Sequence, residues 1–127
     1  MELVVIVILV ALLEYMVFAG LVGRARAKYG VRAPATTGNP EFERTYRVHQ
    51  NTLESLIVFL PAVLAFGCYV SPRWAAGIGV LFIVARAIYA IGYLQAAEKR
   101  FPGAGLTMLV NFVLVVGGLI GLVRAML

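Results

Sequence analysis

The sequence is poor in charged residues and almost without cysteine and histidine. Asp, Glu, Lys and Arg make up 13% of the 127 residues, whereas apolar residues make up 62%. A soluble domain carries about 25% charged residues, so this composition excludes an ordinary soluble fold and favours a membrane protein. A single cysteine, Cys68, excludes an internal disulfide and a multi-cysteine metal site. We expect no metal site, and the apolar sequence around Cys68 predicts a buried, unreactive thiol.

The chain also has few acidic residues, and its formal charge of +5 would suggest nucleic acid as the partner of a soluble protein. Here the basic residues stand beside long hydrophobic segments instead of forming a stripe on a polar domain. Such a distribution is typical of residues that orient a membrane protein. We therefore expect membrane lipids, and no nucleic acid, among the partners.

The hydrophobic segments predict one all-α domain over residues 1–127, an integral membrane four-helix bundle. Crossing about 30 Å of hydrocarbon takes roughly 20 helical residues, so the chain has room for four spans and short connections. Asn39-Pro40 and Ser71-Pro72 each pair a capping side chain with a proline suited to a first helical turn. The expected helices cover about residues 3–23, 40–69, 72–98 and 104–125.

Basic residues gather at two of the three connections. The first and third connections, with their flanks, hold eight of the 11 lysines and arginines: Arg24, Arg26, Lys28, Arg32, Arg44, Arg47, Lys99 and Arg100. In a protein with four spans these two connections lie on the same side of the membrane. The positive-inside rule then predicts a multi-pass protein with both connections in the cytoplasm and both termini outside it.

Two of the expected helices carry a polar stripe. Four polar residues of the second helix, spaced 3, 4 and 3, fall within roughly an 80° arc: Arg44, Arg47, Asn51 and Glu54. Four residues of the third expected helix span roughly 60° by the same arithmetic: Arg86, Tyr89, Tyr93 and Arg100. A charged side chain in hydrocarbon costs about 2.5–3.5 kcal/mol, so such residues usually face a pocket or a partner. Mutual ion pairs between the helices are the structural alternative.

The side chains on these stripes limit what a shared pocket could bind. Arginines bind carboxylates through paired hydrogen bonds, and a glutamate can hold an ammonium group. An asparagine can pair with an amide, and tyrosines offer hydroxyl groups. A small zwitterionic peptide matches this set of partners.

One segment resembles the signature of a known membrane family. The run TTGNPEFERTYR, residues 36–47, continues to Asn51 and Glu54 and is similar to the helix-two signature of the MAPEG family. These are the membrane-associated proteins in eicosanoid and glutathione metabolism. The resemblance extends through Ala85-Arg86, Tyr89, Gly92-Tyr93 and Arg100. It points to the branch that holds the microsomal glutathione transferases and the leukotriene-forming enzymes.

The resemblance implies a homotrimer that binds glutathione, its co-substrate, between neighbouring subunits near the cytoplasmic face. By position it assigns glutathione binding to Arg26, Arg47, Asn51, Glu54, Tyr89 and Tyr93, and the thiol-facing catalytic role to Arg100. Supporting structural roles fall to Arg44, Arg86 and Glu14. The chain departs from the leukotriene-forming pattern at Ser55, where that branch has a tyrosine, and at Ala27, where it has an arginine. These two differences argue against leukotriene synthesis.

The function implied is a microsomal-type glutathione transferase. A free thiol with a pKa near 8.5 is only a few per cent thiolate at neutral pH, and the thiolate is the nucleophile. Lowering that pKa by about two units takes about 2.7 kcal/mol, which one well-placed arginine in a partly dry site can supply. The thiolate would attack a lipophilic electrophile from the bilayer or, in a peroxidase, reduce a lipid hydroperoxide.

Two other functions stay open. Glu14 lies inside the first span, as a glutamate does in small multidrug exporters, so a small transporter is one alternative. The other is a family member that binds lipid or glutathione without catalysis. We expect Glu14 to be structural, either neutral or paired with Arg86, because an unpaired charge there is expensive. His49 resembles the prostaglandin-forming branch, but it projects roughly 140° from Arg44, which favours a packing or capping role.

Overall fold

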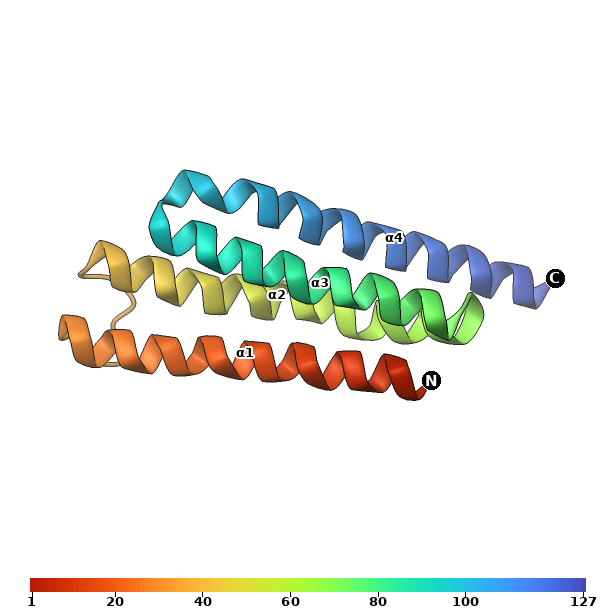
Figure 1. Ribbon diagram of the computed structural model, residues 1–127, viewed down its shortest axis with the longest axis horizontal. Helices are drawn as coiled ribbons and strands as arrows, with labels where there is room; N and C mark the ends of the chain where they lie inside the picture. The colour runs from red at the N-terminus through yellow and green to blue at the C-terminus, as the bar shows by residue number, and fades with distance from the viewer.

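Four long helices lie side by side in the computed structural model, which describes residues 1–127 (Figure 1). The elements are α1 (Glu2–Tyr29), α2 (Pro40–Tyr69), α3 (Pro72–Gln95), the short 3-10 helix η1 (Ala97–Arg100) and α4 (Phe101–Met126). Four helical segments are long and apolar enough to cross a membrane, the last of them running from Ala97 to Met126. The predicted all-α fold with four candidate membrane spans is confirmed.

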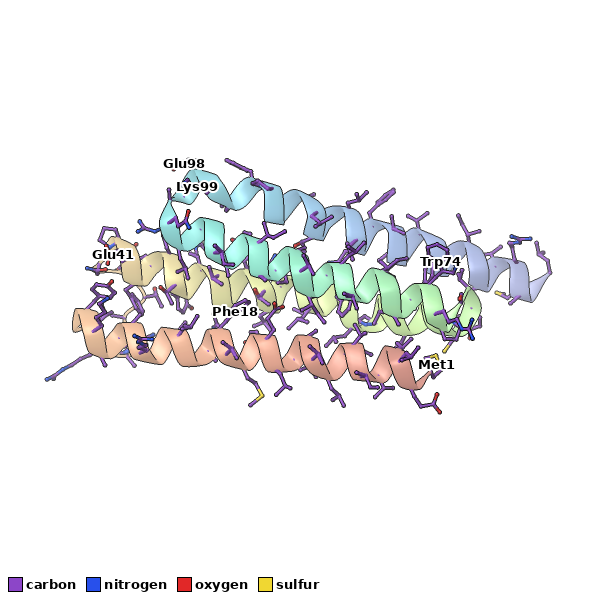
Figure 2. The ribbon with its side chains drawn as sticks, in the orientation of Figure 1. Met1, Phe18, Glu41, Trp74, Glu98 and Lys99 are labelled. Carbon is purple, nitrogen blue, oxygen red and sulfur yellow. The ribbon has the colours of Figure 1, made fainter.

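Both basic connections lie at one end of the bundle, and both termini lie at the other (Figure 1). Glu41, Glu98 and Lys99 mark the end with the connections, whereas Met1 and Trp74 mark the opposite end (Figure 2). The two connections that carry most of the basic residues therefore lie at the same end of the bundle.

Helix α1 continues past the hydrophobic segment that predicted it. It ends at Tyr29 and not near residue 23, and Gly30, with φ +68°, closes it in the left-handed conformation. Hydropathy marks where the chain leaves the hydrocarbon, whereas the helix itself persists while the residues favour it. Arg26 and Lys28 lie in the last turn, where positive side chains interact favourably with the helix dipole.

The break between α3 and α4 comes earlier than predicted. Helix α3 ends at Gln95 and not near residue 98, because Ala96 is extended with φ −161°, and α4 begins at Phe101 and not at residue 104. Arg100 therefore lies on η1, and the prediction that it continues the face of α3 is wrong. Gly92 permits the tight return, since a Cβ there would collide with the backbone carbonyl of Lys99.

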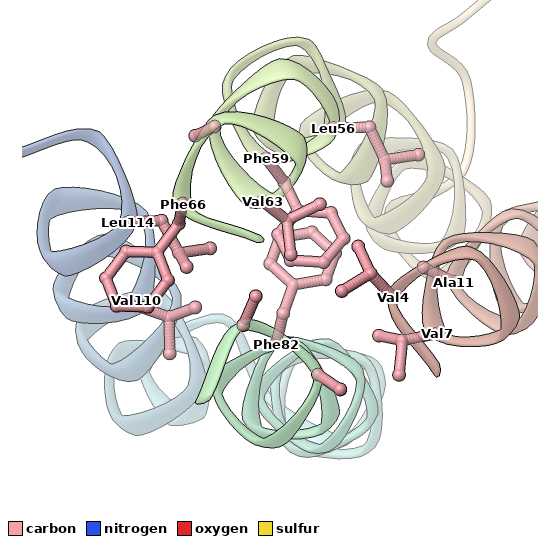
Figure 3. Packing of buried hydrophobic residues seen from close by; sticks show 13 residues of the cluster. Val4, Val7, Ala11, Leu56, Phe59, Val63, Phe66, Phe82, Val110 and Leu114 are labelled. Carbon is pink, nitrogen blue, oxygen red and sulfur yellow. The ribbon is translucent and has the colours of Figure 1, made fainter. Parts of the chain in front are cut away.

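The main core cluster joins all four helices in the half of the bundle that holds the termini (Figure 3). The rings of Phe59 and Phe82 stack at its centre, with centroids 3.9 Å apart and planes 11° apart. On α4, Gly117 and Gly121 let the helix approach α2 closely, and a Cβ at Gly121 would lie 2.6 Å from the carbonyl oxygen of Tyr69.

The outer surface of the bundle is also apolar, and large hydrophobic side chains such as Leu13, Met16, Phe112 and Leu119 are exposed along α1 and α4. This surface suits lipid contact. Cys68 lies exposed on α2, so the prediction that its thiol is buried is wrong. Apolar neighbours in the sequence indicate burial in a soluble protein, but in a membrane protein they also mark the face toward lipid.

Candidate functional site

A polar pocket of about 340 Å³ lies at the end of the bundle that holds the connections. Six residues from α2, α3 and η1 line it: Arg47, Asn51, Glu54, Tyr89, Tyr93 and Arg100. The family resemblance assigns glutathione or its thiol to seven residues, and six of them meet here. Residues from three elements, up to 53 positions apart (47 to 100), thus form one cavity.

The start of α2 sets the position of the first three lining residues. The side chain of Asn39 accepts a hydrogen bond from the backbone N–H of Phe42 at 2.9 Å, and Pro40 occupies the first turn. Val48 and Thr52 then face the interior and are buried. Because successive residues turn by 100°, Arg47 and Asn51 lie beside this buried face, at the edge where α2 meets the pocket.

Arg86 lies beneath the pocket and does not line it. Its side chain is 1% exposed, and its guanidinium donates hydrogen bonds to three side chains on two helices. It reaches the Asn51 Oδ1 atom at 2.9 Å, the Thr52 hydroxyl at 3.0 and 3.2 Å and the Thr107 hydroxyl at 3.2 Å. Nothing in the sequence pattern marks Thr52 and Thr107, since a threonine in a membrane helix usually satisfies its own hydroxyl on the backbone.

Glu14 does not pair with Arg86. No ion pair within 4.0 Å joins them, and the Oε1 atom of Glu14 is buried without a hydrogen-bond partner. The predicted alternative of a Glu14–Arg86 pair is therefore wrong, because neutral oxygen acceptors on α2 and α4 bind the guanidinium instead. A neutral, structural Glu14 stays a prediction.

Two tyrosines of α3 form the wall next to Arg86. Tyr89 is 3% exposed, and its ring lies 4.2 Å from the Arg86 Cζ atom, a cation–π contact. Tyr93 meets it edge to face, with ring centroids 5.5 Å apart. Gly103 of α4 packs directly against the backbone of Tyr89, where any side chain would collide. The position of Tyr89 is thus fixed from two sides.

Arg100 reaches the pocket from η1. Its Nη1 atom donates to the carbonyl oxygen of Ala97 at 2.7 Å, and its Cζ atom lies 5.6 Å from the ring of Tyr93. The guanidinium is only partly buried, so most of its hydrogen-bonding capacity is available to a ligand. It is the cation best placed to meet a group bound against the tyrosines.

Arg26, Arg44 and His49 do not line this pocket. Arg26 donates to the carbonyl oxygen of Ala35 at 2.7 Å and stacks on the ring of Phe42, so it braces the connection between α1 and α2. Arg44 is half-buried and its Nε atom has no partner. His49 stacks on Tyr15 of α1 with centroids 4.6 Å apart, in agreement with the predicted packing role. Of the four residues in the polar stripe of α2, Arg47, Asn51 and Glu54 therefore line the pocket, whereas Arg44 does not.

An apolar groove follows on the same face of α2, in the half of the bundle that holds the termini. It has a volume of about 420 Å³, and α2 and α4 line it: Val58, Pro61, Ala62, Ala65, Leu114, Val115, Gly118, Leu119 and Leu122. Positions 47, 51, 54, 58, 61 and 65 follow each other at spacings of 4, 3, 4, 3 and 4, which keeps them on one helical face. One stripe of α2 thus lines a polar cavity and then an apolar one.

The pocket offers hydrogen bonds and charge, but none of its lining residues is a serine, cysteine, histidine or lysine that could act as a nucleophile. Two arginines face one glutamate across it, an excess of positive charge that favours an anionic ligand. The arrangement can bind and orient a small charged molecule.

Known proteins resemble this chain over most of its length. The model of the MAPEG family matches residues 4–120. An uncharacterized protein of Synechocystis sp. is 51% identical over 112 residues, 88% of this chain and 82% of the relative. Microsomal glutathione S-transferase 2 of Homo sapiens is 38% identical over 87% of this chain and 75% of its own length. Leukotriene C4 synthase of Cavia porcellus is 37% identical over 74% of this chain and 63% of its own length.

Proposed function

Because the chain belongs to the MAPEG family, we propose that it is a membrane-bound glutathione transferase that binds glutathione in the polar pocket. The observation that carries the proposal is the convergence of Arg47, Asn51 and Glu54 with Tyr89, Tyr93 and Arg100 around one cavity. Relatives named microsomal glutathione S-transferase support the choice of ligand.

The charges of the pocket complement those of glutathione. The tripeptide carries two carboxylates and one ammonium group, and the pocket presents Arg47 and Arg100 with Glu54. Each arginine can bind a carboxylate or a thiolate, and the glutamate can hold the ammonium group. The tyrosine hydroxyls and the Asn51 amide supply neutral hydrogen bonds to the peptide groups.

In the proposed mechanism Arg100 stabilises the thiolate of bound glutathione. The thiol loses its proton to solvent, and the thiolate attacks the electrophilic carbon of the acceptor, forming a C–S bond as the leaving group departs with the bonding pair. With a lipid hydroperoxide, the thiolate attacks the terminal oxygen and forms the sulfenic acid, while the lipid alkoxide leaves and takes a proton from solvent to become the alcohol. A second glutathione then converts the sulfenic acid to disulfide and water. Peroxidase activity is thus a variant of the same thiolate chemistry.

The apolar groove between α2 and α4 gives the chain of a lipophilic acceptor a place on the same face of α2 as the polar pocket. Val58, Pro61 and Ala65 lie on the stripe of α2 that carries Arg47, Asn51 and Glu54 closer to the connections. An acceptor that enters from the bilayer can therefore keep its chain in the groove while its reactive carbon approaches the polar pocket.

The proposal includes the assembly and the orientation of the protein. Arg26 contacts its own connection, so in a homotrimer it would reach glutathione only where a neighbouring subunit's pocket lies beside that connection. Both basic connections would lie in the cytoplasm, with the termini outside it. Crosslinking of purified protein and protease accessibility of the connections in sealed vesicles test these two points.

The function is tested by mixing the purified protein in detergent with glutathione and an electrophilic aryl halide. We expect saturable glutathione binding together with conjugate formation above the uncatalysed rate. Saturable binding without conjugation would favour the non-catalytic binder. No binding, together with proton-coupled drug exchange in vesicles that Glu14→Gln abolishes, would favour the transporter.

A further inference from the structure

We propose that Thr52 and Thr107 are positioning residues that act through Arg86 to fix the side-chain amide of Asn51. This inference rests on the proposed function, because it concerns how the glutathione pocket is held. The Asn51 carbonyl oxygen would be turned toward the guanidinium, so that the N–H groups of the amide face the ligand. The ligand group that meets Asn51 is then a hydrogen-bond acceptor, such as a peptide carbonyl or a carboxylate.

Both threonine hydroxyls are restricted to accepting hydrogen bonds from Arg86. The Thr52 hydroxyl donates its own proton to the carbonyl oxygen of Val48 at 2.7 Å, and the Thr107 hydroxyl donates to that of Gly103 at 2.8 Å. A hydroxyl has one proton and two lone pairs, so each oxygen can only accept from a further partner. Arg86, which can only donate, is the complementary group.

The three helices therefore hold the guanidinium at defined points. Thr52 binds its Nε and Nη2 atoms from α2, Thr107 binds Nη1 from α4, and the ring of Tyr89 lies 4.2 Å away on α3. Nη2 also donates to the Asn51 Oδ1 atom at 2.9 Å. With no carboxylate within 4.0 Å, Arg86 depends on these neutral oxygens. Because a guanidinium is planar and rigid, the contacts with the two threonines also fix the Nη2 N–H group that donates to Asn51.

The orientation of Asn51 follows from this contact. An asparagine amide has one acceptor end and one donor end, and the two can exchange by rotation unless a partner selects one. Arg86 has no acceptor, so it can bind only the oxygen. The donor end is left to the pocket that Asn51 lines. The sequence alone allowed either end of the amide to face the ligand.

Asn51→Asp tests the orientation without disturbing the threonines. Either oxygen of the new carboxylate can accept from Arg86, so the fold should persist, but no donor faces the ligand. We expect the glutathione dissociation constant to rise about tenfold or more, measured by calorimetry on the intact protein. Unchanged or tighter binding would mean that a donor of glutathione, such as its ammonium group, meets this residue, and would overturn the inference.

Thr52→Val and Thr107→Val test the positioning role, with Thr52→Ser and Thr107→Ser as rescue variants. Valine keeps the shape but removes the acceptor, and we expect glutathione affinity to fall about tenfold, whereas serine should restore it. Thr45→Val is the matched control, because the Thr45 hydroxyl also bonds to a carbonyl oxygen four residues back, that of Glu41, but lies far along α2 from Arg86.

A double-mutant cycle separates positioning from a general loss of structure. In an Asn51→Ala background, Thr52→Val should cause no further loss of affinity, because its effect passes through Asn51. An equal loss in both backgrounds would overturn the inference, and so would wild-type affinity in both valine variants. If the valine variants do not fold, the glutathione affinity of Asn51→Asp alone tests the inference. If the wild type and Thr45→Val both fail to bind glutathione, the proposed function itself is wrong.

Discussion

The two halves of the bundle are filled by different kinds of side chain. In the half that holds the termini, the stacked rings of Phe59 and Phe82 occupy the centre, and apolar side chains surround them. Toward the connections, a buried arginine lies among hydroxyl and amide groups, with a polar pocket beside it. The buried arginine of the second half costs free energy to place in a membrane, whereas the stacked rings of the first half do not.

The apolar side chains of the first half stabilise the fold, whereas the polar side chains of the second half are available to bind a ligand. Lipid tails are as apolar as leucine, so packing of shapes, and not exclusion of water, holds the apolar half together. The polar half would be more easily inserted if Arg86 were a leucine. Its hydrogen bond to Asn51 gives the buried arginine a role if the pocket needs a fixed amide.

The largest effect should come from Arg100→Ala, which removes the proposed thiolate partner. A shift of about two pKa units corresponds to about 100-fold in conjugation rate at neutral pH. Glutathione affinity should change much less, the pattern of an interaction that serves the reactive form. The rate of the variant should rise with pH toward the free thiol pKa, because hydroxide then generates the thiolate. A wild-type rate with an unshifted pH profile would remove Arg100 from the mechanism.

A change in the apolar half should affect stability and leave the pocket intact. Phe59→Ala removes one of two stacked rings at a fully buried position. We expect a loss of about 2 kcal/mol in folding free energy, less than in a soluble core because the unfolded helices stay in lipid. Thermal unfolding in detergent measures the loss. Glutathione affinity of the folded fraction should equal that of the wild type, and a tenfold change would show that the halves are coupled.

Next in size are Arg47→Ala and Glu54→Ala, which change the rim of the pocket. Each should raise the glutathione dissociation constant about tenfold, or about 1.4 kcal/mol. Insertion and thermal stability should be retained, because the Arg47 and Glu54 side chains are exposed. Arg44→Ala is the matched control on the same helix, since Arg44 lies outside the pocket. Equal affinities in all four proteins would place glutathione elsewhere.

The smallest effect should come from Glu14→Gln. The substitution is nearly isosteric, and no hydrogen bond or ion pair of Glu14 is lost by it. Conjugation rate and glutathione affinity should stay within about twofold of the wild type, as for changes away from a site. A strong loss of drug or proton exchange in vesicles, with unchanged stability, would instead support the transporter.

The sequence predicted the parts of the fold that have a local signal. Asn39 caps α2 through its side chain as expected, and Ser71 accepts from the backbone N–H of Trp74 at 3.3 Å at the start of α3. The end of α3 had no such signal, because residues 93–101 contain neither proline nor glycine. The close approach of Lys99 to Gly92 decides it, and that is a tertiary contact.

The family resemblance predicted the residues that line the pocket, but it did not predict the side chains that hold those residues in place. Helical arithmetic put Arg86 on one face with Tyr89, and it could not say whether the guanidinium reaches the ligand or the interior. Its partners Thr52 and Thr107 lie on other helices, 34 and 21 residues away. Helical periodicity within one segment contains no information on such partners, whereas the packing of α2, α3 and α4 defines them.

We propose that the polar pocket binds glutathione as its thiolate. Ultraviolet difference absorbance of the purified wild-type protein, titrated with glutathione at neutral pH, tests it most directly. We expect a saturable thiolate band, which is absent with the S-methyl derivative and greatly reduced in Arg100→Ala at saturating glutathione. Saturable binding of glutathione by the wild type without any thiolate band would contradict it.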